Sequence, residues 1–208
     1  MKLQIAVDLA DTKRILEIAD QIHDVIDIYE VGTPVIMKEG MIPVKTLKQK
    51  YPELCVLADT KIVDGGALEC KDVCEAGADI ITVLALADEE TISEVCNVAH
   101  HYGRKVLADL ICVENIPQKA KQLMDLQVDY IGVHTGVDMQ KRGRTPLRDL
   151  KELVAVADHS MTAVAGGINL KTIDSYVNLS PEIVIAGSSL YNSGNIRQAV
   201  IDMKAHLV

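Results

Sequence analysis

The chain contains no phenylalanine and no tryptophan, and its six tyrosines are its only aromatic residues. Because 49% of its 208 residues are nevertheless hydrophobic, the core must be built from aliphatic side chains. That composition is typical of an α/β fold. The length falls within the usual range for one domain. We therefore expect residues 1–208 to form a single domain.

Positive charge is scarce. The chain has 21 Lys and Arg residues against 30 Asp and Glu, a formal charge of −9 and a pI of about 5.1. A nucleic-acid groove normally needs a concentrated basic face. The longest basic cluster, Lys141-Arg142-Gly143-Arg144, is predicted to be a solvated loop, although it could reach a small phosphate. Nucleic acid is therefore not an expected partner.

Long apolar runs, a disulfide framework and nucleotide motifs are also missing. No run of 18 apolar residues occurs, and Met1–Gln4 leads into a strand pattern without a signal sequence. Five scattered cysteines suit reduced thiols better than disulfides. Neither GxGxxG nor GxxxxGK is found, so no NAD or ATP site is implied. We expect a cytoplasmic protein that has no membrane partner.

Short runs rich in Val, Ile and Ala alternate with longer amphipathic segments along the whole chain. This alternation is typical of βαβ units whose parallel sheet is buried on both faces. The predicted strands are Leu3–Leu9, Asp27–Gly32, Cys55–Lys61, Asp79–Leu86, Lys105–Ile111, Tyr130–Gly136, Met161–Gly167 and Ile183–Ser189.

The predicted strands also repeat. Every second strand opens on an acidic residue, and these residues, Asp27, Asp79, Asp129 and Glu182, are spaced by 52, 50 and 53 positions. The other four strands end on an acid or glycine, at positions 8, 59, 109 and 166. Two βα units repeated four times close naturally into a barrel. The predicted fold is therefore α/β, a single (β/α)8 TIM barrel.

Charged residues stand at the carboxyl ends of several predicted strands, although strands buried on both faces should contain almost no charge. In this fold the carboxyl ends form the active-site face, whereas charges at strand starts belong to the opposite, stabilising face. The residues that we expect to meet at the barrel mouth are Asp8, Glu30, Asp59, Lys61, Asp109 and His134.

The sharpest local pattern is Asp59-Thr60-Lys61-Ile62-Val63-Asp64. Residues 59 and 61 are two apart on a strand and should project to the same side, with Asp64 on the following loop. A lysine between two carboxylates stays protonated and can donate to an oxyanion. The alternative is a structural salt bridge at the rim. The other charges at the mouth favour the functional interpretation.

Three further residues of the mouth suggest chemistry. Glu30 and Asp59 are candidate ligands for Mg²⁺, because two carboxylates that face a cavity with room for water suit this ion. A carboxylate pair alone is a weak signal. His134 could be a hydrogen-bonded core histidine, but at a strand end it can also transfer protons.

Glycines follow the last two predicted strands. Gly166 and Gly167 end the seventh, and Gly187 and Ser188 follow the core of the eighth. Glycine lets backbone N–H groups approach a phosphate, and these two loops are the usual phosphate site of the fold. Simple turn glycines are the alternative. Their positions favour a phosphate site.

Together these residues resemble the orotidine monophosphate decarboxylase superfamily, whose mark is an Asp-x-Lys-x-x-Asp motif after strand three, here Asp59 to Asp64. Within it, the chain is most similar over its whole length to the 3-hexulose-6-phosphate synthase family. The segments that carry this similarity are Ala6–Leu9, Glu30–Pro34, Ala58–Lys61, Gly77–Val83 and Val133–Asp138.

The resemblance implies a Mg²⁺-dependent aldol condensation of formaldehyde with ribulose 5-phosphate through an enediolate. Glu30 and Asp59 would hold the metal, and Lys61 would bind the enediolate oxygens. His134 would move the C1 proton, while Asp8 and Asp109 would orient substrate hydroxyls or water. The family also implies a homodimer in which Asp64 reaches the neighbouring active site.

Two alternatives stay open. The related 3-keto-L-gulonate-6-phosphate decarboxylase family shares the motif, but has Glu at the position of Asp109, a basic residue at Val137 and Arg at Ser188. A barrel that only binds a sugar phosphate would be expected to have lost Asp59, Lys61 or Asp64, and this chain keeps all three.

Overall fold

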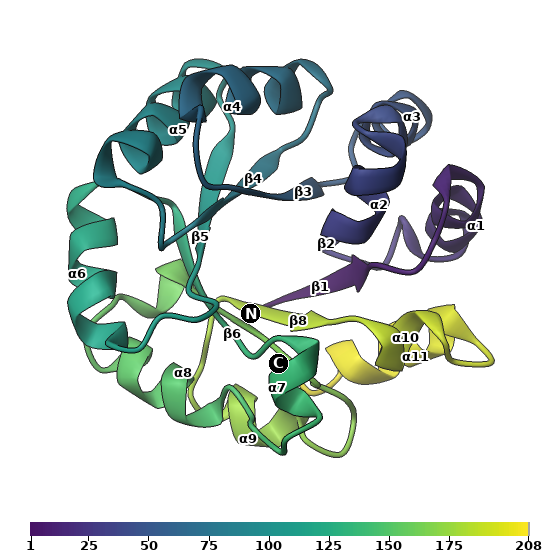
Figure 1. The fold of residues 1–208 in the computed structure, drawn as a ribbon. Coiled ribbons are helices and arrows are strands. Elements are labelled where there is room, and N and C mark those ends of the chain that lie inside the picture. The colour runs from purple at the N-terminus through teal and green to yellow at the C-terminus, as the bar shows by residue number, and fades with distance from the viewer. Residues whose placement is uncertain (208) are drawn as a thin grey trace.

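Eight parallel strands pair in sequence order and close into a barrel in the computed structural model, which describes residues 1–207 (Figure 1). The first strand pairs with the second and, closing the ring, with the eighth. The predicted (β/α)8 TIM barrel is confirmed. The strands are β1 (Lys2–Val7), β2 (Ile28–Val31), β3 (Val56–Ile62), β4 (Ile80–Leu84), β5 (Lys105–Asp109), β6 (Tyr130–His134), β7 (Thr162–Ala165) and β8 (Ile183–Ala186).

Every predicted strand segment overlaps one of these strands, but seven of the predictions run one to three residues past the observed carboxyl end. Ala85 and Leu110 show the reason. Both follow the last paired residue of their strand and are still buried. Apolar residues in the sequence indicate burial, and burial continues at least one residue past the assigned end of these strands.

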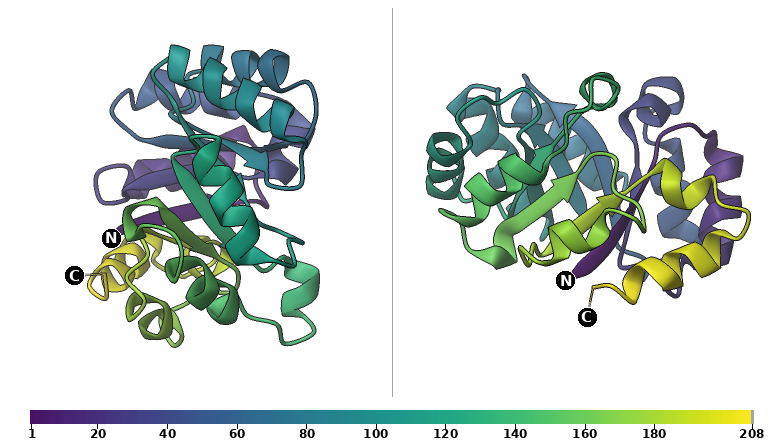
Figure 2. Two further views of the ribbon diagram at one scale, coloured as in Figure 1. Left: turned by 90° about the vertical axis from the view of Figure 1, so that its left-hand side faces the viewer. Right: turned by 90° about the horizontal axis from the view of Figure 1, so that it is seen from below.

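Helices surround the strands on the outside of the barrel, as Figures 1 and 2 show. Asp11, Asp88 and Pro146 precede three of the helices, and the carboxylate of Asp11 accepts the Arg14 N–H over 2.7 Å. The helices are α1 (Thr12–Ile22), α2 (Thr33–Glu39), α3 (Ile42–Lys50), α4 (Gly66–Glu75), α5 (Glu89–His101), α6 (Ile116–Asp125), α7 (Val137–Gln140), α8 (Leu147–Val154), the 3-10 turn η1 (His159–Met161), α9 (Ile173–Val177), α10 (Ser188–Tyr191) and α11 (Ile196–Lys204). Among residues 1–207, no helix has both the length and the apolar character that a membrane span requires.

The core has two parts, because successive strand residues point to opposite faces of the sheet. The larger part lies between the strands and the helices and includes Leu3, Ile5 and Val7 of β1. The smaller part fills the barrel itself. Its members are Ile28, Leu57, Ile80, Leu107, Tyr130, Ala163, Ile183 and Ile185.

At the amino ends of the strands, three repeated acids stabilise the barrel. The carboxylates at the starts of β2, β4 and β6 each accept a backbone N–H from the strand before. The pairs are Asp27 with Leu3 (2.8 Å), Asp79 with Val56 (2.9 Å) and Asp129 with Val106 (2.8 Å). A cavity of about 660 Å³ lies at this end, lined by Asp27 and Asp79 and by Lys48 and Arg104, which form ion pairs with Asp79. The predicted assignment of these acids to the stabilising face is confirmed.

The first and last helices close the outer ring. Arg197 on α11 donates to both oxygens of Asp24, which follows α1, over 2.6 and 2.8 Å, and to the carbonyl of Gln21 over 3.0 Å. Lys204 reaches Asp27 over 2.7 Å. Both views of Figure 2 place the start of β1 beside the end of α11.

Candidate active site

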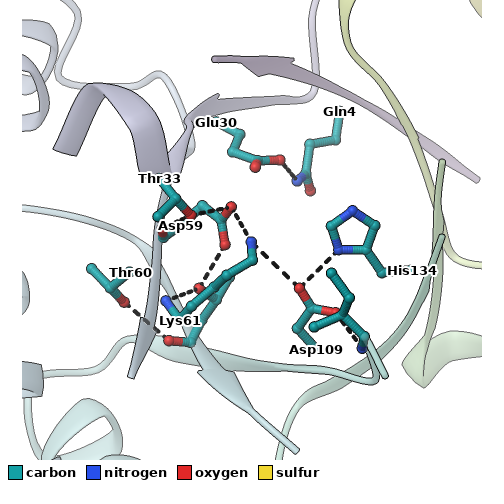
Figure 3. Close-up of polar contacts among 10 residues, drawn as sticks. Gln4, Glu30, Thr33, Asp59, Thr60, Lys61, Asp109 and His134 are labelled. Carbon is teal, nitrogen blue, oxygen red and sulfur yellow. Dashed lines mark hydrogen bonds and ion pairs between the residues drawn. The ribbon is translucent and has the colours of Figure 1, made fainter. Parts of the chain in front are cut away.

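Five of the six predicted residues, Glu30, Asp59, Lys61, Asp109 and His134, meet at the carboxyl ends of the strands (Figure 3). The sixth, Asp8, lies near enough for the charges of Asp59, Lys61 and His134 to affect its pKa. The six residues come from β2, β3, β5 and β6, and from the residue after β1. Glu30, Asp59 and Asp109 are each only 5–7% exposed. Buried carboxylates are rare unless they are paired or bind a ligand. These side chains therefore form the candidate active site.

Lys61 lies between two carboxylates. Its Nζ forms an ion pair with Asp59 and lies 3.5 Å from Oδ2 of Asp109. Burial works against its charge, but Asp59 and Asp109 outweigh this and raise the pKa of Lys61 above its ordinary value. Lys61 is thus a fixed positive charge at neutral pH and a suitable donor to an oxyanion.

Asp64 does not contribute to this cluster within the chain, contrary to the expectation that it would be the second carboxylate beside Lys61. Its side chain is exposed and accepts only the neighbouring Gly65 N–H, over 2.8 Å. The reason is the path of the chain: β3 ends at Ile62, and residue 64 lies on the loop that leaves the barrel. Asp109 of β5 takes the place that the motif suggested for Asp64.

The Asp59–Lys61 segment departs from a regular strand. Lys61 has a φ of +49°, and the pairing of β3 with β4 changes register between Ala58 and Ile62. The hydroxyl of Thr82 on β4 holds this bulge. It donates to Oδ1 of Asp59 over 2.9 Å and accepts the Lys61 backbone N–H over 2.9 Å. Asp59 and Lys61 meet as predicted, but through a bulge and not through simple strand alternation.

Asp59 is held from the other side by Thr33 at the start of α2. The Thr33 hydroxyl lies 2.8 Å from Oδ2 of Asp59 and 2.7 Å from its backbone carbonyl. A carboxylate has about four acceptor positions. Thr33, Lys61 and Thr82 use three of them on Asp59, so its orientation is fixed and one position on Oδ1 stays available.

His134 is oriented by Asp109. Oδ2 of Asp109 lies 2.9 Å from Nδ1 of His134, and Oδ1 accepts the Ile111 backbone N–H over 2.8 Å. Although burial opposes ionisation, the contacts with His134 and Lys61 lower the pKa of Asp109 below its ordinary value. The carboxylate is therefore charged at neutral pH. It holds the Nδ1 proton and leaves Nε2 as the ring's proton acceptor.

Glu30 and Asp8 occupy the other side of the mouth. Oε2 of Glu30 accepts a 2.5 Å hydrogen bond from the amide of Gln4. Burial, followed by the charges of Asp59 and Asp8, raises the pKa of Glu30 well above its ordinary value. Burial and Asp59 likewise raise the pKa of Asp8. A Cβ on Gly32 would lie 2.8 Å from the Val7 carbonyl and would also meet Oδ1 of Asp8, so a larger residue would displace Asp8 or the end of β1.

The donor set fits a hard divalent cation. Glu30 and Asp59 keep acceptor positions free, and the buried Oε1 of Gln4 has no partner among the described residues. Within residues 1–207, no three or more His, Cys, Asp or Glu side chains are grouped to hold a metal. A cation would thus take two protein carboxylates and complete its shell with water or substrate, which is a common pattern for Mg²⁺.

The two predicted phosphate loops lie side by side. Ser189 donates to the carbonyl of Ile168 over 2.8 Å and so joins the loop after β8 to the loop after β7. Gly166 has a φ of +126°, and a Cβ there would lie 2.7 Å from the Thr135 carbonyl. Gly187 and Ser188 form the start of α10. The structure therefore brings Gly166, Gly167, Gly187 and Ser188 to one edge of the barrel mouth.

Sequence reasoning missed three residues of the site, namely Gln4, Thr33 and Thr82. Gln4 and Thr82 are polar residues within apolar strand runs, and both are buried. An inward-facing polar residue in such a run is a usable signal. Thr33 carries no comparable signal, because threonine is common at helix starts.

A closed parallel barrel with buried carboxylates and a partly buried lysine and histidine at the carboxyl ends of its strands defines a (β/α)8-barrel enzyme. Comparison with known proteins identifies the family of this enzyme. Residues 1–203 match the model of the orotidine 5′-phosphate decarboxylase / HUMPS family, and the chain belongs to this family.

Similar proteins cover the whole chain. The 3-hexulose-6-phosphate synthase of Bacillus subtilis (strain 168) is 38% identical over 208 residues, which are 100% of this chain and 99% of that protein. The crystal structure of 3-hexulose-6-phosphate synthase from Salmonella typhimurium has a TM-score of 0.96 and 38% identity, covering 100% and 98% of the two chains. The 3-keto-L-gulonate-6-phosphate decarboxylase of Vibrio cholerae has a TM-score of 0.87 and 28% identity, covering 99% and 96%. The predicted enzyme class, an aldehyde-lyase of this superfamily, is confirmed by the synthases.

Proposed function

We propose that the chain catalyses the Mg²⁺-dependent aldol addition of formaldehyde to D-ribulose 5-phosphate, giving 3-hexulose 6-phosphate, and the reverse reaction. The observation that carries this proposal is the series His134–Asp109–Lys61–Asp59, which offers a proton acceptor beside a fixed cation. The full-length similarity to 3-hexulose-6-phosphate synthases supports the choice of substrates.

His134 is the proposed base. With Nδ1 on Asp109, its Nε2 can accept the proton that leaves C1 of ribulose 5-phosphate. The imidazolium that forms is stabilised by the Asp109 carboxylate. The product of this step is an enediolate, whose C1 attacks the carbonyl carbon of formaldehyde. The C=O π bond of formaldehyde breaks, and the alkoxide that forms takes the proton back from the His134 imidazolium.

Lys61 stabilises the negative charge that develops on the enediolate oxygens. Its ammonium group is held by Asp59 and Asp109 before the substrate binds, so little reorganisation is needed during the reaction. Charge stabilisation that appears only in the transition state raises the rate and not merely the affinity. Asp8 and Asp109 are proposed to orient substrate hydroxyls or water.

Glu30 and Asp59 are the proposed Mg²⁺ ligands. When bound, the ion would polarise the ketone and hydroxyl oxygens of the substrate. Glu30, Asp59 and Asp8 bring three carboxylates together beside one lysine, and a divalent cation would offset that excess of negative charge.

Gly166, Gly167, Gly187 and Ser188 are proposed to bind the substrate phosphate through backbone N–H groups. None of these four N–H groups has a hydrogen-bond acceptor within residues 1–207. The proposed base, His134, and the ammonium group of Lys61 thus lie near β3–β6, whereas the proposed phosphate donors lie after β7 and β8.

A homodimer is proposed as the functional unit, with Asp64 acting in the partner's site. Exposed apolar side chains follow the strands around the mouth and would be covered by a second copy. They include Leu9, Val63, Leu68, Leu86 and Val137, each more than half exposed. Scattered exposed apolar residues are ordinary, but several on one functional face favour an interface.

A cytoplasmic location is also proposed, because all five cysteines are free thiols.

Sugar-phosphate decarboxylation is the second candidate, supported by the likeness to the Vibrio cholerae enzyme. Val137 argues against it. That family is expected to pair its histidine with a basic residue at this position, whereas Val137 is an exposed apolar side chain that can neither donate a hydrogen bond nor carry charge.

One comparison decides between the two candidates. The purified protein with Mg²⁺ is assayed for formaldehyde-dependent condensation with ribulose 5-phosphate and, in parallel, for decarboxylation of 3-keto-L-gulonate 6-phosphate. We expect the higher kcat/KM for condensation. The opposite order would assign the chain to the decarboxylases.

A further inference from the structure

Gln4 is an unusual residue for its position. It lies on β1, 1% exposed, at the level of Ile28 and Ile185 in the otherwise apolar barrel interior. Its amide nitrogen has one partner, Oε2 of Glu30 at 2.5 Å, and its amide oxygen has none among the described residues. Burying an amide with half of its groups unsatisfied costs stability. An apolar residue would fit this layer better, so Gln4 calls for a reason other than packing.

The contact with Glu30 supplies that reason. The amide nitrogen must face Glu30, because the amide oxygen would repel the carboxylate. A neutral donor orients a carboxylate without neutralising it, whereas a lysine at this place would form an ion pair and compete with a bound cation. Figure 3 shows Gln4 and Glu30 side by side, with the second oxygen of Glu30 toward Asp59.

We propose that Gln4 is a positioning residue that holds one oxygen of Glu30 and thereby presents the other, together with Asp59, to a divalent cation. This inference rests on the metal site of the proposed function. Partners of this kind, which orient a ligand without touching the metal, set the geometry and affinity of metal sites. Gln4 thus lowers the stability of the barrel interior and raises the affinity of the mouth for a divalent cation.

The test measures metal binding and stability separately. Mn²⁺ affinity is determined by electron paramagnetic resonance, with Mg²⁺ as competitor, and Tm by thermal unfolding of the metal-free protein. We expect Gln4→Met, which is similar in size and apolar, to bind Mn²⁺ about 10- to 100-fold more weakly. Its Tm should equal or exceed that of the wild type. Gln4→Leu is the second variant, in case the methionine packs badly.

Two controls separate the possible causes. Ser193→Ala also removes a buried polar atom without a partner, but away from Glu30, and should leave Mn²⁺ affinity unchanged. Glu30→Gln reports the loss of the ligand itself and should weaken binding most.

Wild-type Mn²⁺ affinity in both Gln4 variants, with Glu30→Gln impaired, would overturn the role of Gln4 and leave the metal site standing. If Glu30→Gln leaves Mn²⁺ affinity unchanged, the metal site and this inference are both overturned.

Discussion

The carboxylate of Asp109 contacts Nδ1 of His134 over 2.9 Å, and the same oxygen lies 3.5 Å from Nζ of Lys61. One buried anion therefore fixes the tautomer of the proposed base and the position of the proposed oxyanion donor. Because the two contacts share one atom, a change at Asp109 should affect both groups at once.

Proton removal from C1 should depend on His134. Solvent deuterium should enter C1 of ribulose 5-phosphate even without formaldehyde, and His134→Asn or His134→Ala should slow this exchange by about 10²- to 10⁴-fold, as is typical when a general base is lost. Asp109→Asn should also slow it, because an amide can donate to Nδ1 and select the wrong tautomer. The exchange is followed by NMR. If it is indifferent to both His134 variants, the base is Asp8 or Asp109.

Divalent metal should be required for turnover. Treatment with EDTA should abolish condensation and added Mg²⁺ should restore it, whereas Glu30→Gln and Asp59→Asn should not recover at the same Mg²⁺ concentration. A crystal structure with Mg²⁺ should show carboxylate oxygens at about 2.1 Å from the ion. Glu53→Gln, at the opposite end of the barrel, is the control variant. Full activity of metal-free protein would refute both ligand assignments.

Asp64 should act on the neighbouring subunit's substrate. Lys61→Ala and Asp64→Ala proteins, each inactive alone, should regain activity when mixed and allowed to exchange subunits. Recovery should approach about a quarter of wild type, because random pairing makes about half of the dimers hybrids and each hybrid of an isologous dimer has one intact site. Lys61→Ala mixed with Asp59→Ala should recover nothing. A fully active monomer in sedimentation would rule the model out.

The hydroxyl of Thr82 should be needed for catalysis more than for folding. Thr82→Val keeps the shape of the side chain but removes the contacts with Asp59 and with the Lys61 backbone. Hydrogen bonds to charged groups contribute about 1.5–3 kcal/mol, so kcat/KM should fall by roughly 10- to 100-fold. Thr82→Ser keeps the hydroxyl and should retain most of the activity. Equal losses in both variants would indicate a packing effect.

The Asp24–Arg197 ion pair should stabilise the fold only above acidic pH. Arg197 lowers the pKa of Asp24 from its ordinary value of 3.8 to about 2. A lowered carboxylate pKa contributes stability that is fully present above about pH 4 and is lost as the pH falls through about 2. Urea unfolding of wild type and Asp24→Asn should therefore differ at pH 6 and converge toward pH 2. A difference that is independent of pH would show that the carboxylate charge does not matter.

The barrel and the positions of its charged residues could be predicted from the sequence, because both follow from patterns that repeat along the chain. Asp27, Asp79 and Asp129 recur at nearly equal spacing, and strand ends such as Asp109 and His134 stand out against apolar neighbours. The side-chain contacts between strands could not be predicted in this way. That Lys61 would meet Asp109 and not Asp64 depends on the β3 bulge and on the end of β3 at Ile62, which no local pattern reports.

The supporting residues show the same limit. Thr82 is one threonine in an apolar run, and its importance follows only from the register that places it against Asp59 and Lys61. Gln4 and Glu30 are 26 positions apart. Strand pairing across the barrel decides such contacts.

The repeated contacts of Asp27, Asp79 and Asp129 with the preceding strand lie at the end of the barrel opposite the reacting groups. Substitutions at distant sites that share no partners usually have additive effects. Exchange of residues around His134 should therefore change the reaction at little cost to ring closure. Such a division makes the scaffold evolvable: new substrates can be explored at one end while the other preserves the fold.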